Sequence, residues 1–320
     1  MAGLRSIESL RYEIASQLTI LSKLPLPRPI NPRNCVMTGS GDSFIAASIA
    51  TYLSSYRIIT CYPTSIILNP GILDCRDLYI ISVSGNTAHN IVVAKLASQK
   101  DIKTTAITAN PQSELAKSCD KIIRIKYRRS GAPTSGTISF LSCVLICLAL
   151  VTRVNCNPKD VRMSFEMANR KVEVLLDKIS DKSLSILFLG DGLLYPVAHY
   201  GSLKMNEVLG VKSFHYSLQE YCHAPLFGLK KNDTVIILNG TEGQNPNAAK
   251  TRNKLFENLS RLNYSVFSLN FSGSSPITCL LQSIFAVQLL ALKKAEKKGL
   301  RDCFFVQNKE LLDTSSACIY

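Results

Sequence analysis

Two patterns of hydrophobic and polar positions alternate along the chain. Short apolar runs, each followed by a glycine-rich or polar turn, give way to stretches with apolar residues three or four positions apart. Runs of the first kind indicate parallel strands buried on both faces, and stretches of the second kind indicate helices. Strands that alternate with helices form a parallel sheet covered on both faces. The pattern therefore predicts an α/β fold made of doubly wound parallel sheets.

The predicted elements occur in a repeated order. The strands are expected at residues 35–38, 58–62, 78–83, 103–108, 121–125, 185–189, 234–238 and 264–269. The helices are expected at residues 6–24, 44–56, 90–99, 159–178, 198–209, 246–262 and 278–298, with a short one starting at Ser113. The order strand, glycine loop, helix, strand, polar loop, helix, strand occurs twice, which indicates an internal duplication. We expect two tandem flavodoxin-like modules, residues 1–160 with the leading helix and residues 161–320.

The most apolar stretch, residues 140–151, is too short to span a bilayer and is expected to form a buried helix at a domain or subunit contact. The N-terminal residues carry early charges and lack the apolar core of a signal peptide. Eleven cysteines are spread over the chain, many inside apolar runs, which indicates buried thiols in a reducing compartment. We therefore expect a cytoplasmic protein without a membrane anchor.

The chain is basic, with 37 Lys and Arg residues against 23 Asp and Glu residues and a formal charge of +14. This excess favours acidic partners such as phosphorylated metabolites. Nucleic acid is not expected, because the densest basic clusters lack interleaved aromatic residues for base stacking. These clusters comprise Lys126, Arg128 and Arg129, and Lys293, Lys294, Lys297 and Lys298. No CxxC or Cys/His ligand spacing occurs, so no metal site is predicted.

The loop at residues 82–87, Ser-Val-Ser-Gly-Asn-Thr, follows a predicted buried strand and precedes a predicted helix. Backbone N–H groups, hydroxyl donors and the positive end of a helix dipole together suit a phosphate dianion. The same composition is also typical of a capped turn without a ligand. The corresponding loop of the second half, residues 238–243, carries one hydroxyl and a glutamate that would repel phosphate. We therefore expect the anion in the first half.

Three motifs of the first half occur together in order. They are GSGDS at residues 39–43, ISVSGNTAHN at residues 81–90 and TANPQSELAKSCD at residues 108–120. These motifs resemble the sugar isomerase (SIS) family, a doubly wound phosphosugar-binding fold that often occurs in tandem. The resemblance implies that the second motif is the phosphate loop, although the family often has a glutamate where this chain has Asn86.

Residues 186–229 narrow the resemblance to the isomerase module of glucosamine-6-phosphate synthase and to archaeal SIS-type glucosamine-6-phosphate deaminases. In those enzymes the motif L-K-x-x-E is followed, 16 positions after the glutamate, by a histidine. Leu203, Lys204, Glu207 and His223 stand in that register here. The resemblance implies that Glu207 is the general base between C1 and C2 and that His223 assists ring opening, reaching the site from the neighbouring subunit. Lys204 would orient the carboxylate or stabilise an enolate oxygen.

The resemblance also implies the residues that hold the sugar phosphate. The phosphate-binding set is Ser43, Ser82, Ser84, Gly85, Asn86 and Thr87. The weaker set for the sugar is Gly41, Asp42, Thr134 and Ser135. The resemblance implies a homodimer with shared active sites. It implies no cofactor or metal. The remaining histidines, His89, His199 and His215, are interpreted as structural, and Arg128 and Arg129 as a solvated strand end.

Two departures from the family pattern affect the predicted chemistry. The residues before the first module do not resemble a glutaminase domain, so glutamine hydrolysis is not expected. The relatives end in a segment with a lysine that engages the open-chain sugar, and here Thr314 stands at that position, with Lys309 five positions earlier.

We predict an enzyme that converts glucosamine 6-phosphate to fructose 6-phosphate and ammonia. The alternatives are a phosphoglucose or phosphomannose isomerase, which the S-G-N-T loop also resembles, and a non-catalytic sugar-phosphate-binding regulatory protein.

Overall fold

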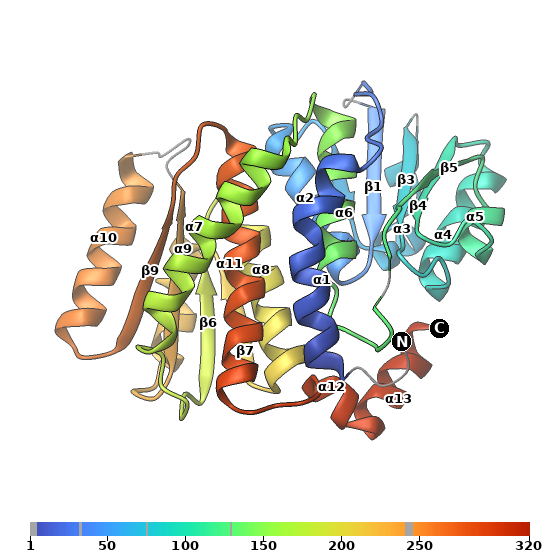
Figure 1. Ribbon diagram of the computed structural model, residues 1–320. Coiled ribbons are helices and arrows are strands. Elements are labelled where there is room, and N and C mark those ends of the chain that lie inside the picture. Colours follow the sequence, from blue (N-terminus) through green and yellow to red (C-terminus); the bar gives the residue numbers. More distant parts are fainter. Residues whose placement is uncertain (1–4, 32–33, 75, 129, 241–245) are drawn as a thin grey trace. The chain divides into compact units, whose positions relative to one another are not determined.

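The chain divides into two compact units, each built on one parallel sheet (Figure 1). This computed structural model describes residues 5–31, 34–74, 76–128, 130–240 and 246–320. The first-sheet unit comprises residues 19–129, 136–155 and 308–320, and the second-sheet unit comprises residues 1–18, 130–135 and 156–307. The boundary predicted near residue 160 concerns the duplicated modules and stays a prediction.

The sheet of the first-sheet unit has the strand order β2-β1-β3-β4-β5, with every neighbouring pair parallel. Its strands are β1 (Cys35–Gly39), β2 (Ile59–Cys61), β3 (Asp77–Ile81), β4 (Thr104–Thr108) and β5 (Lys121–Arg124). The central strands β1 and β4 are buried along their whole length, because helices cover both faces and strands flank both edges. This is the doubly wound architecture that the unbroken apolar runs predict.

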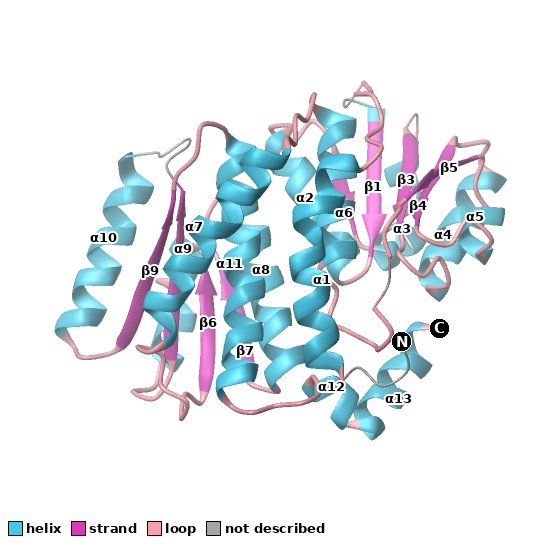
Figure 2. Cartoon of the chain, viewed as in Figure 1, coloured by secondary structure: helices cyan, strands magenta, loops and turns pink. Residues whose placement is uncertain are grey.

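Helices cover both faces of this sheet (Figure 2). They are α2 (Asp42–Leu53), α3 (Pro63–Leu68), α4 (Ala88–Gln99), α5 (Glu114–Lys117) and α6 (Ile138–Val151), with a 3₁₀ turn at Pro70–Leu73. Residues from α3 and α4 pack with Val36, Leu78 and Ile80 in one apolar cluster, while α2 packs against α6. The predicted buried helix is confirmed, since all but two residues of α6 are buried.

The sheet of the second-sheet unit has the order β7-β6-β8-β9, again with parallel neighbours. Its strands are β6 (Ser185–Leu189), β7 (Lys212–Tyr216), β8 (Thr234–Gly240) and β9 (Ser265–Phe271). Counted from the first strand of each unit, these four strands follow the same order as the first four of the other sheet. The shared order agrees with the predicted duplication.

The helices of the second-sheet unit begin with α1 (Ser6–Ile20), which extends two residues into the other unit and ends in a 3₁₀ turn at Leu21–Lys23. The others are α7 (Pro158–Leu176), α8 (Leu194–Lys204), α9 (Leu218–Tyr221), α10 (Pro246–Arg261), α11 (Pro276–Lys297) and α12 (Phe304–Gln307). Successive side chains of each strand point to opposite faces of the sheet, so the core has two parts. On one face, Leu187, Val235 and Ile237 pack with α9 and α10. Phe188 on the opposite face contacts α8 at Gly201, next to Val287 of α11.

Helix α11 has the length and mean hydropathy, 1.5, of a membrane span, but 83% of that window is buried in the protein. Core helices of globular proteins share these properties. Its charged end is tied to other elements, since Lys293, Lys294 and Lys297 pair with Glu173, Asp181 and Asp177. The basic cluster in this helix is therefore neutralised largely within the protein.

Strand β7 and helices α3, α9, α12 and α13 (Lys309–Ile319) were not predicted from the sequence, and three of them have a clear physical reason. Strand β7 was not predicted, because it is an edge strand whose sequence, Lys-Ser-Phe-His-Tyr, is short and half polar. Helix α3 was not predicted; the proline that starts it occupies the first turn, where no N–H is needed. The third, α13 in the first-sheet unit, has no buried residue, so its apolar positions gave no core pattern.

Candidate functional site

The predicted phosphate loop lies at the carboxyl end of β3, the edge of a parallel sheet where ligands bind in this fold class. Its side chains turn back on the loop itself. The Ser82 hydroxyl accepts a hydrogen bond from the Gly85 N–H at 3.1 Å and lies 3.2 Å from the Thr87 hydroxyl. The Ser84 hydroxyl accepts from the Asn86 N–H at 3.3 Å. Three hydroxyl groups thus surround the start of α4.

Gly85 fixes the curvature of this loop. Its φ is +72°, in the left-handed region that favours glycine. A Cβ on this residue would stand 2.0 Å from the Ser113 hydroxyl, so the space is closed as well. The Gly85 carbonyl accepts from the Leu115 N–H at 3.0 Å, which ties the loop to the segment after β4. The motif at residues 108–120 therefore holds the loop of the motif at residues 81–90 in place.

Helix α4 begins directly after the loop. Thr87 is its N-cap in extended conformation, and its side chain makes no capping bond to the first turn. Among the described residues, no acceptor is recorded for the N–H groups of Thr87, Ala88 and His89. Free N–H groups at the positive end of a helix of 12 residues, beside three hydroxyls, form an arrangement that suits an anion. Asn86 and His89 are exposed beside it.

The first glycine loop precedes α2 in the same unit. Gly41 is the N-cap of α2 with φ +54°, and Asp42 and Ser43 occupy its first turn. Ser43 is buried against Gly39, where a Cβ would stand 2.8 Å from the Ser43 Cβ. Asp42 faces Gly136, where a Cβ would stand 2.6 Å from its Oδ2. The structure thus places Ser43 in a tight turn, and Asp42 next to the segment that follows Ser135.

In the second-sheet unit, Glu207 lies on a π-helical turn, Met205–Leu209, that continues α8. π-Helical turns inside α-helices occur frequently at functional sites. Gly210, with φ +64°, ends this turn against Phe304, where a Cβ would stand 2.5 Å from ring carbons. The turn widens the helix at the position of the predicted base.

Lys204 and Glu207 form the ion pair that their spacing predicts. The Lys204 Nζ lies 2.6 Å from the Glu207 Oε2. The lysine side chain is 1% exposed and its ammonium lies over the Tyr200 ring, 5.0 Å from the centroid, whereas the glutamate is 39% exposed. A buried ammonium needs its carboxylate partner, since an unpaired buried charge is costly. The cation therefore fixes the orientation of Glu207.

Ser135 is the second partner of Glu207. Its hydroxyl, in a side chain that is 2% exposed, donates to the same Oε2 atom that Lys204 contacts. Among the described residues, no hydrogen bond to the Glu207 Oε1 is recorded. The two donors hold one oxygen, and the other stays available to a ligand in the exposed part of the side chain.

Glu13 of α1 anchors the segment that carries Ser135. Its carboxylate, 5% exposed, accepts from the Ser130 hydroxyl at 2.6 Å, the Ser130 N–H at 3.3 Å and the Thr134 hydroxyl at 2.8 Å. Thr134, predicted to contact the sugar, is thus committed to Glu13 by its hydroxyl. Glu13 was missed by the sequence reasoning, although a carboxylate three residues after Leu10 falls on the apolar side of this helix.

Cys303 is a second residue that the sequence did not indicate. Its buried N–H donates to the Ser6 hydroxyl at 2.6 Å, and burial raises the pKa of its thiol despite hydrogen bonds from Ser6 and the Ser135 backbone. The thiol is close enough to Glu207 and Lys204 to interact with both charges. It therefore lies near the Ser135 and Glu207 contact.

His223 is exposed between α9 and the 3₁₀ turn Ala224–Gly228, and its N–H donates to the Glu220 carbonyl at 3.1 Å. No contact between His223 and Glu207 is recorded among the described parts of the chain. The role that the resemblance implies for it stays a prediction.

The other two histidines of this unit form a pair. The rings of His199 and His215 stack at 3.8 Å and 12°, and the His215 Nδ1 lies 3.3 Å from the Ser202 hydroxyl. Burial, with the neighbouring His215, lowers the pKa of His199 to about 4, and burial lowers that of His215. This pairing between α8 and β7 agrees with the structural role predicted for both.

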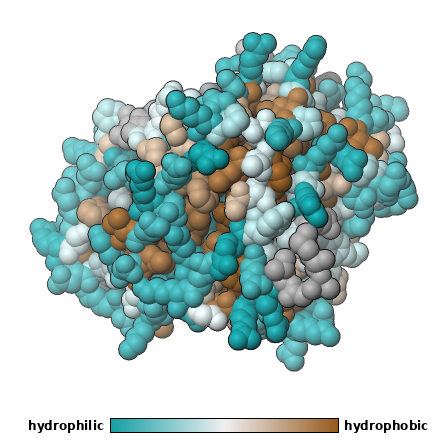
Figure 3. Space-filling model, viewed as in Figure 1, coloured by the Kyte–Doolittle hydropathy of each residue, from teal (hydrophilic) through white to brown (hydrophobic). Residues whose placement is uncertain are grey.

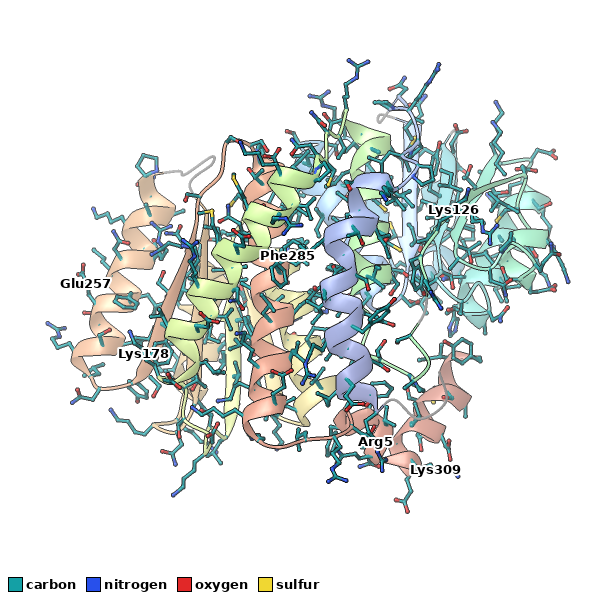
Figure 4. All side chains as sticks on the ribbon, viewed as in Figure 1. Arg5, Lys126, Lys178, Glu257, Phe285 and Lys309 are labelled. Atoms are coloured by element: carbon teal, nitrogen blue, oxygen red, sulfur yellow. The ribbon has the colours of Figure 1, made fainter. Side chains whose placement is uncertain are left out.

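The C-terminal segment forms α13, capped by Asn308, whose side chain accepts from the Leu311 N–H. The Thr314 hydroxyl donates to the Glu310 carbonyl of its own helix at 2.8 Å. Lys309, labelled in Figure 4, is exposed at the start of the helix. Residues 241–243 of the counterpart loop and Arg129 lie outside the described residues, and Arg128 is exposed beyond β5.

The sequence and the fold were compared with known proteins. Residues 30–153 match the SIS domain family. A probable glutamine--fructose-6-phosphate aminotransferase [isomerizing] of Acanthamoeba polyphaga mimivirus is 26% identical over 300 residues, which is 83% of this chain and 48% of that protein. The chain thus spans about half the length of this relative, and less of others.

Solved structures share the fold over most of the chain. The C-terminal domain of glucosamine-fructose-6-phosphate aminotransferase from Francisella tularensis superposes with a TM-score of 0.69 at 18% identity, covering 92% of this chain and 94% of that chain. Glucosamine-6-phosphate deaminase from Thermotoga maritima gives a TM-score of 0.66 at 20% identity, covering 92% and 93%. The resemblance to the SIS family that the motifs indicated is confirmed, and so is the prediction of two parallel α/β sheets.

Proposed function

We propose, from the premise that residues 30–153 belong to the SIS domain family, that this protein is a phosphosugar isomerase or deaminase acting on glucosamine 6-phosphate. The proposed products are fructose 6-phosphate and ammonia. The observation that carries the proposal is the arrangement of Glu207, with one oxygen held by Lys204 and Ser135 and the other available. Proton transfer between adjacent sugar carbons requires such a positioned carboxylate.

Phosphate binding is assigned to the loop before α4. The N–H groups at the helix start and the hydroxyls of Ser82, Ser84 and Thr87 would take the phosphate oxygens, because donors of both kinds gather there. Asn86 would contribute its backbone, and Ser43 a hydroxyl from α2. The basic charge of the protein, +14, would favour the approach of the dianion.

In the proposed reaction the Glu207 carboxylate removes the proton from C2 of the open-chain sugar and returns it at C1. The Lys204 ammonium stays paired with the carboxylate and keeps Oε1 directed outward. His223 would assist ring opening. Proton return at C1 leaves an imine at C2, which water hydrolyses to fructose 6-phosphate and ammonia. The steps therefore use side chains, the substrate and one water molecule.

The test is to incubate the purified protein with glucosamine 6-phosphate and to measure ammonia and fructose 6-phosphate. Glu207→Gln should reduce turnover by roughly a hundredfold or more while the affinity for the phosphosugar changes little. Turnover of glucose 6-phosphate or mannose 6-phosphate in place of the amino sugar would move the assignment to an aldose–ketose isomerase. Full activity of the Glu207→Gln variant would remove Glu207 from the mechanism.

A second candidate is a binding protein that holds a sugar phosphate without converting it. The observation that favours it is Thr314, an exposed residue bonded within its own helix at the position where relatives carry a lysine. Calorimetry distinguishes the two candidates, because a binding protein shows heat of binding without product. Glu207→Gln should leave affinity nearly unchanged under both candidates, so product formation by the wild type decides between them.

A further inference from the structure

The edge of the second sheet at β9 differs from the corresponding edge of the first sheet. In the first sheet, β4 is covered by β5 and is buried along its whole length. Strand β9 has the equivalent place in its own sheet, yet no described strand pairs with its outer side and three of its residues are half-buried and one exposed. The second sheet therefore lacks a fifth strand where the first sheet has one.

A groove follows this open edge. It encloses about 730 Å³ and is lined by five consecutive residues of β9, Val266 to Asn270, together with residues of α7 and α10 and with Ile237 and Asn239 of β8. Consecutive strand residues point to opposite faces of a sheet, so a groove that contacts all five wraps around the edge. Figure 4 labels Lys178, just after α7, and Glu257 on α10, the two helices that flank β9. The groove therefore lies where a fifth strand would pair with β9, with α7 and α10 on either side.

The backbone of β9 is available for pairing. An edge strand in a parallel sheet directs part of its N–H and C=O groups away from its single neighbour. Among the described residues, no hydrogen bond from elements other than β8 is recorded for the backbone of Val266 to Asn270. Exposed edges of this kind accept an added strand from another chain.

Apolar side chains give the groove a floor. Val174 of α7 is 64% exposed, and Phe256 and Phe267 are half-buried beside it. The space-filling view shows hydrophobic residues among hydrophilic ones in the region where Figure 1 places β9 and α7 (Figure 3). An occupant with alternate apolar side chains would bury this surface.

The part of α7 that lines the groove is basic. One of the acidic residues of this helix, Glu173, pairs with Lys293 of α11, and Asp177, just after the helix, pairs with Lys297. The groove side carries Arg170, Lys171 and Lys178, for which no carboxylate partner is recorded within the described chain. Arg252 of α10 adds a fourth cation, bonded to Asn239 at 2.6 Å, against the single carboxylate of Glu257.

We propose that the open edge of β9 binds an extended, acidic segment of a partner protein, which adds to the second sheet as a fifth strand. Backbone pairing with β9 supplies the affinity, apolar side chains of the segment fill the floor, and its carboxylates contact the cations of α7 and α10. A second copy of this chain fits less well. Pairing two β9 edges brings Arg170, Lys171 and Lys178 of one copy close to those of the other.

The test uses a fluorescent peptide of alternating Val and Glu, as long as the 7 residues of β9. We expect saturable binding to the full chain and slower amide hydrogen exchange in residues 265–270 when the peptide is present. The double variant Lys171→Glu, Lys178→Glu should weaken binding about tenfold or more. The matched control is Lys159→Glu, Arg162→Glu, which reverses two exposed charges of α7 outside the groove and should leave affinity within about twofold.

Several results would overturn the proposal. These are no binding of the Val and Glu peptide, equal binding of a Val and Lys peptide, or equal loss of affinity in the control variant. Binding without protection of residues 265–270 would indicate charge attraction at the surface instead of strand addition. Protection of β9 that rises with protein concentration, with dimers in sedimentation, would assign the edge to a second copy. Because none of these readouts involves sugar turnover, they are independent of the proposed activity.

Discussion

At the scale of single residues, the proposed base depends on a chain of polar contacts. Glu13 holds the segment 130–135, Ser135 at its end donates to Glu207, and Lys204 donates to the same oxygen. The two carboxylates play different parts. Glu207 is 39% exposed and can meet a ligand, whereas Glu13 is 5% exposed and has three protein donors.

Glu13→Gln should lower the rate constant of the proposed reaction by about tenfold without changing phosphosugar affinity, because the amide loses the charge and one acceptor that hold Ser130 and Thr134. The unfolding free energy should fall by about 1.5–3 kcal/mol, the usual size of a lost hydrogen bond to a charged group. Steady-state kinetics and urea unfolding measure both effects. Glu8→Gln, an exposed substitution on the same helix, is the control, and equal rates for the two variants would contradict the positioning role.

The paired histidines predict a dependence of stability on pH. In the folded protein His199 stays neutral down to about pH 4, whereas in the unfolded chain it gains a proton near the ordinary value of 6.5. The unfolded state thus binds more protons in this window, so the unfolding free energy falls as the pH drops from 6.5 toward 4. Urea unfolding at several pH values should show a shallower decline for His199→Gln than for the exposed control His89→Gln. Identical slopes would exclude a contribution of the pair.

At the scale of elements, the first-sheet unit builds the proposed anion site from two segments that meet after β3 and β4. The loop before α4 supplies the donors, and the turn at Ser113 closes the space behind Gly85. Ser113 also caps helix α5, since its hydroxyl accepts from the Ala116 N–H. This helix is only four residues long, so its position depends on such contacts more than on helix propensity.

Gly85→Ala should reduce phosphosugar affinity by at least about tenfold and the unfolding free energy by roughly 2 kcal/mol, because it adds left-handed strain and a Cβ against Ser113. Calorimetry and chemical unfolding check the two effects. Gly71→Ala is the matched control in the same unit, where a Cβ would meet Asp74 at an ordinary 3.6 Å. An alanine variant that binds as tightly as the wild type would show that the loop does not hold the phosphate.

At the scale of the whole molecule, the resemblance to the SIS family implies that His223 acts in the neighbouring subunit. If active sites are shared in a homodimer, a mixture of Glu207→Gln and His223→Ala chains should regain activity. Each heterodimer then has one site with both lesions and one intact site, so random mixing restores about a quarter of wild-type turnover.

This complementation is measured by mixing, unfolding and refolding the two variants and assaying fructose 6-phosphate. Each variant refolded alone is the control. Turnover no higher than the sum of the two controls would indicate that Glu207 and His223 act within one chain, or that His223 has no role.

Strand and helix positions were predictable where burial on both faces leaves an unbroken apolar run, as in β3, β6 and β8. Strand β7 was not predictable, because it is an edge strand and its polar residues Lys212 and His215 interrupt the apolar run. The Lys204 to Glu207 pair was predictable, because the two residues are three positions apart on a helix and interact through local geometry. Phosphate binding by the loop at residues 82–87 stays a prediction. Glu13 and Cys303 were not predictable, because a buried carboxylate or thiol carries no sign of its partner in the sequence.

The sequence by itself determined the order of strands and helices, the loop that suits a phosphate and the spacing that pairs a lysine with the proposed base. All three depend on short-range periodicity and on local hydrogen bonding. Only the tertiary structure decided that Ser135 contacts Glu207 across 72 residues and that Glu13 holds Thr134 across 121. It also decided that β9 keeps an open edge, because strand pairing is a long-range choice made by the whole sheet.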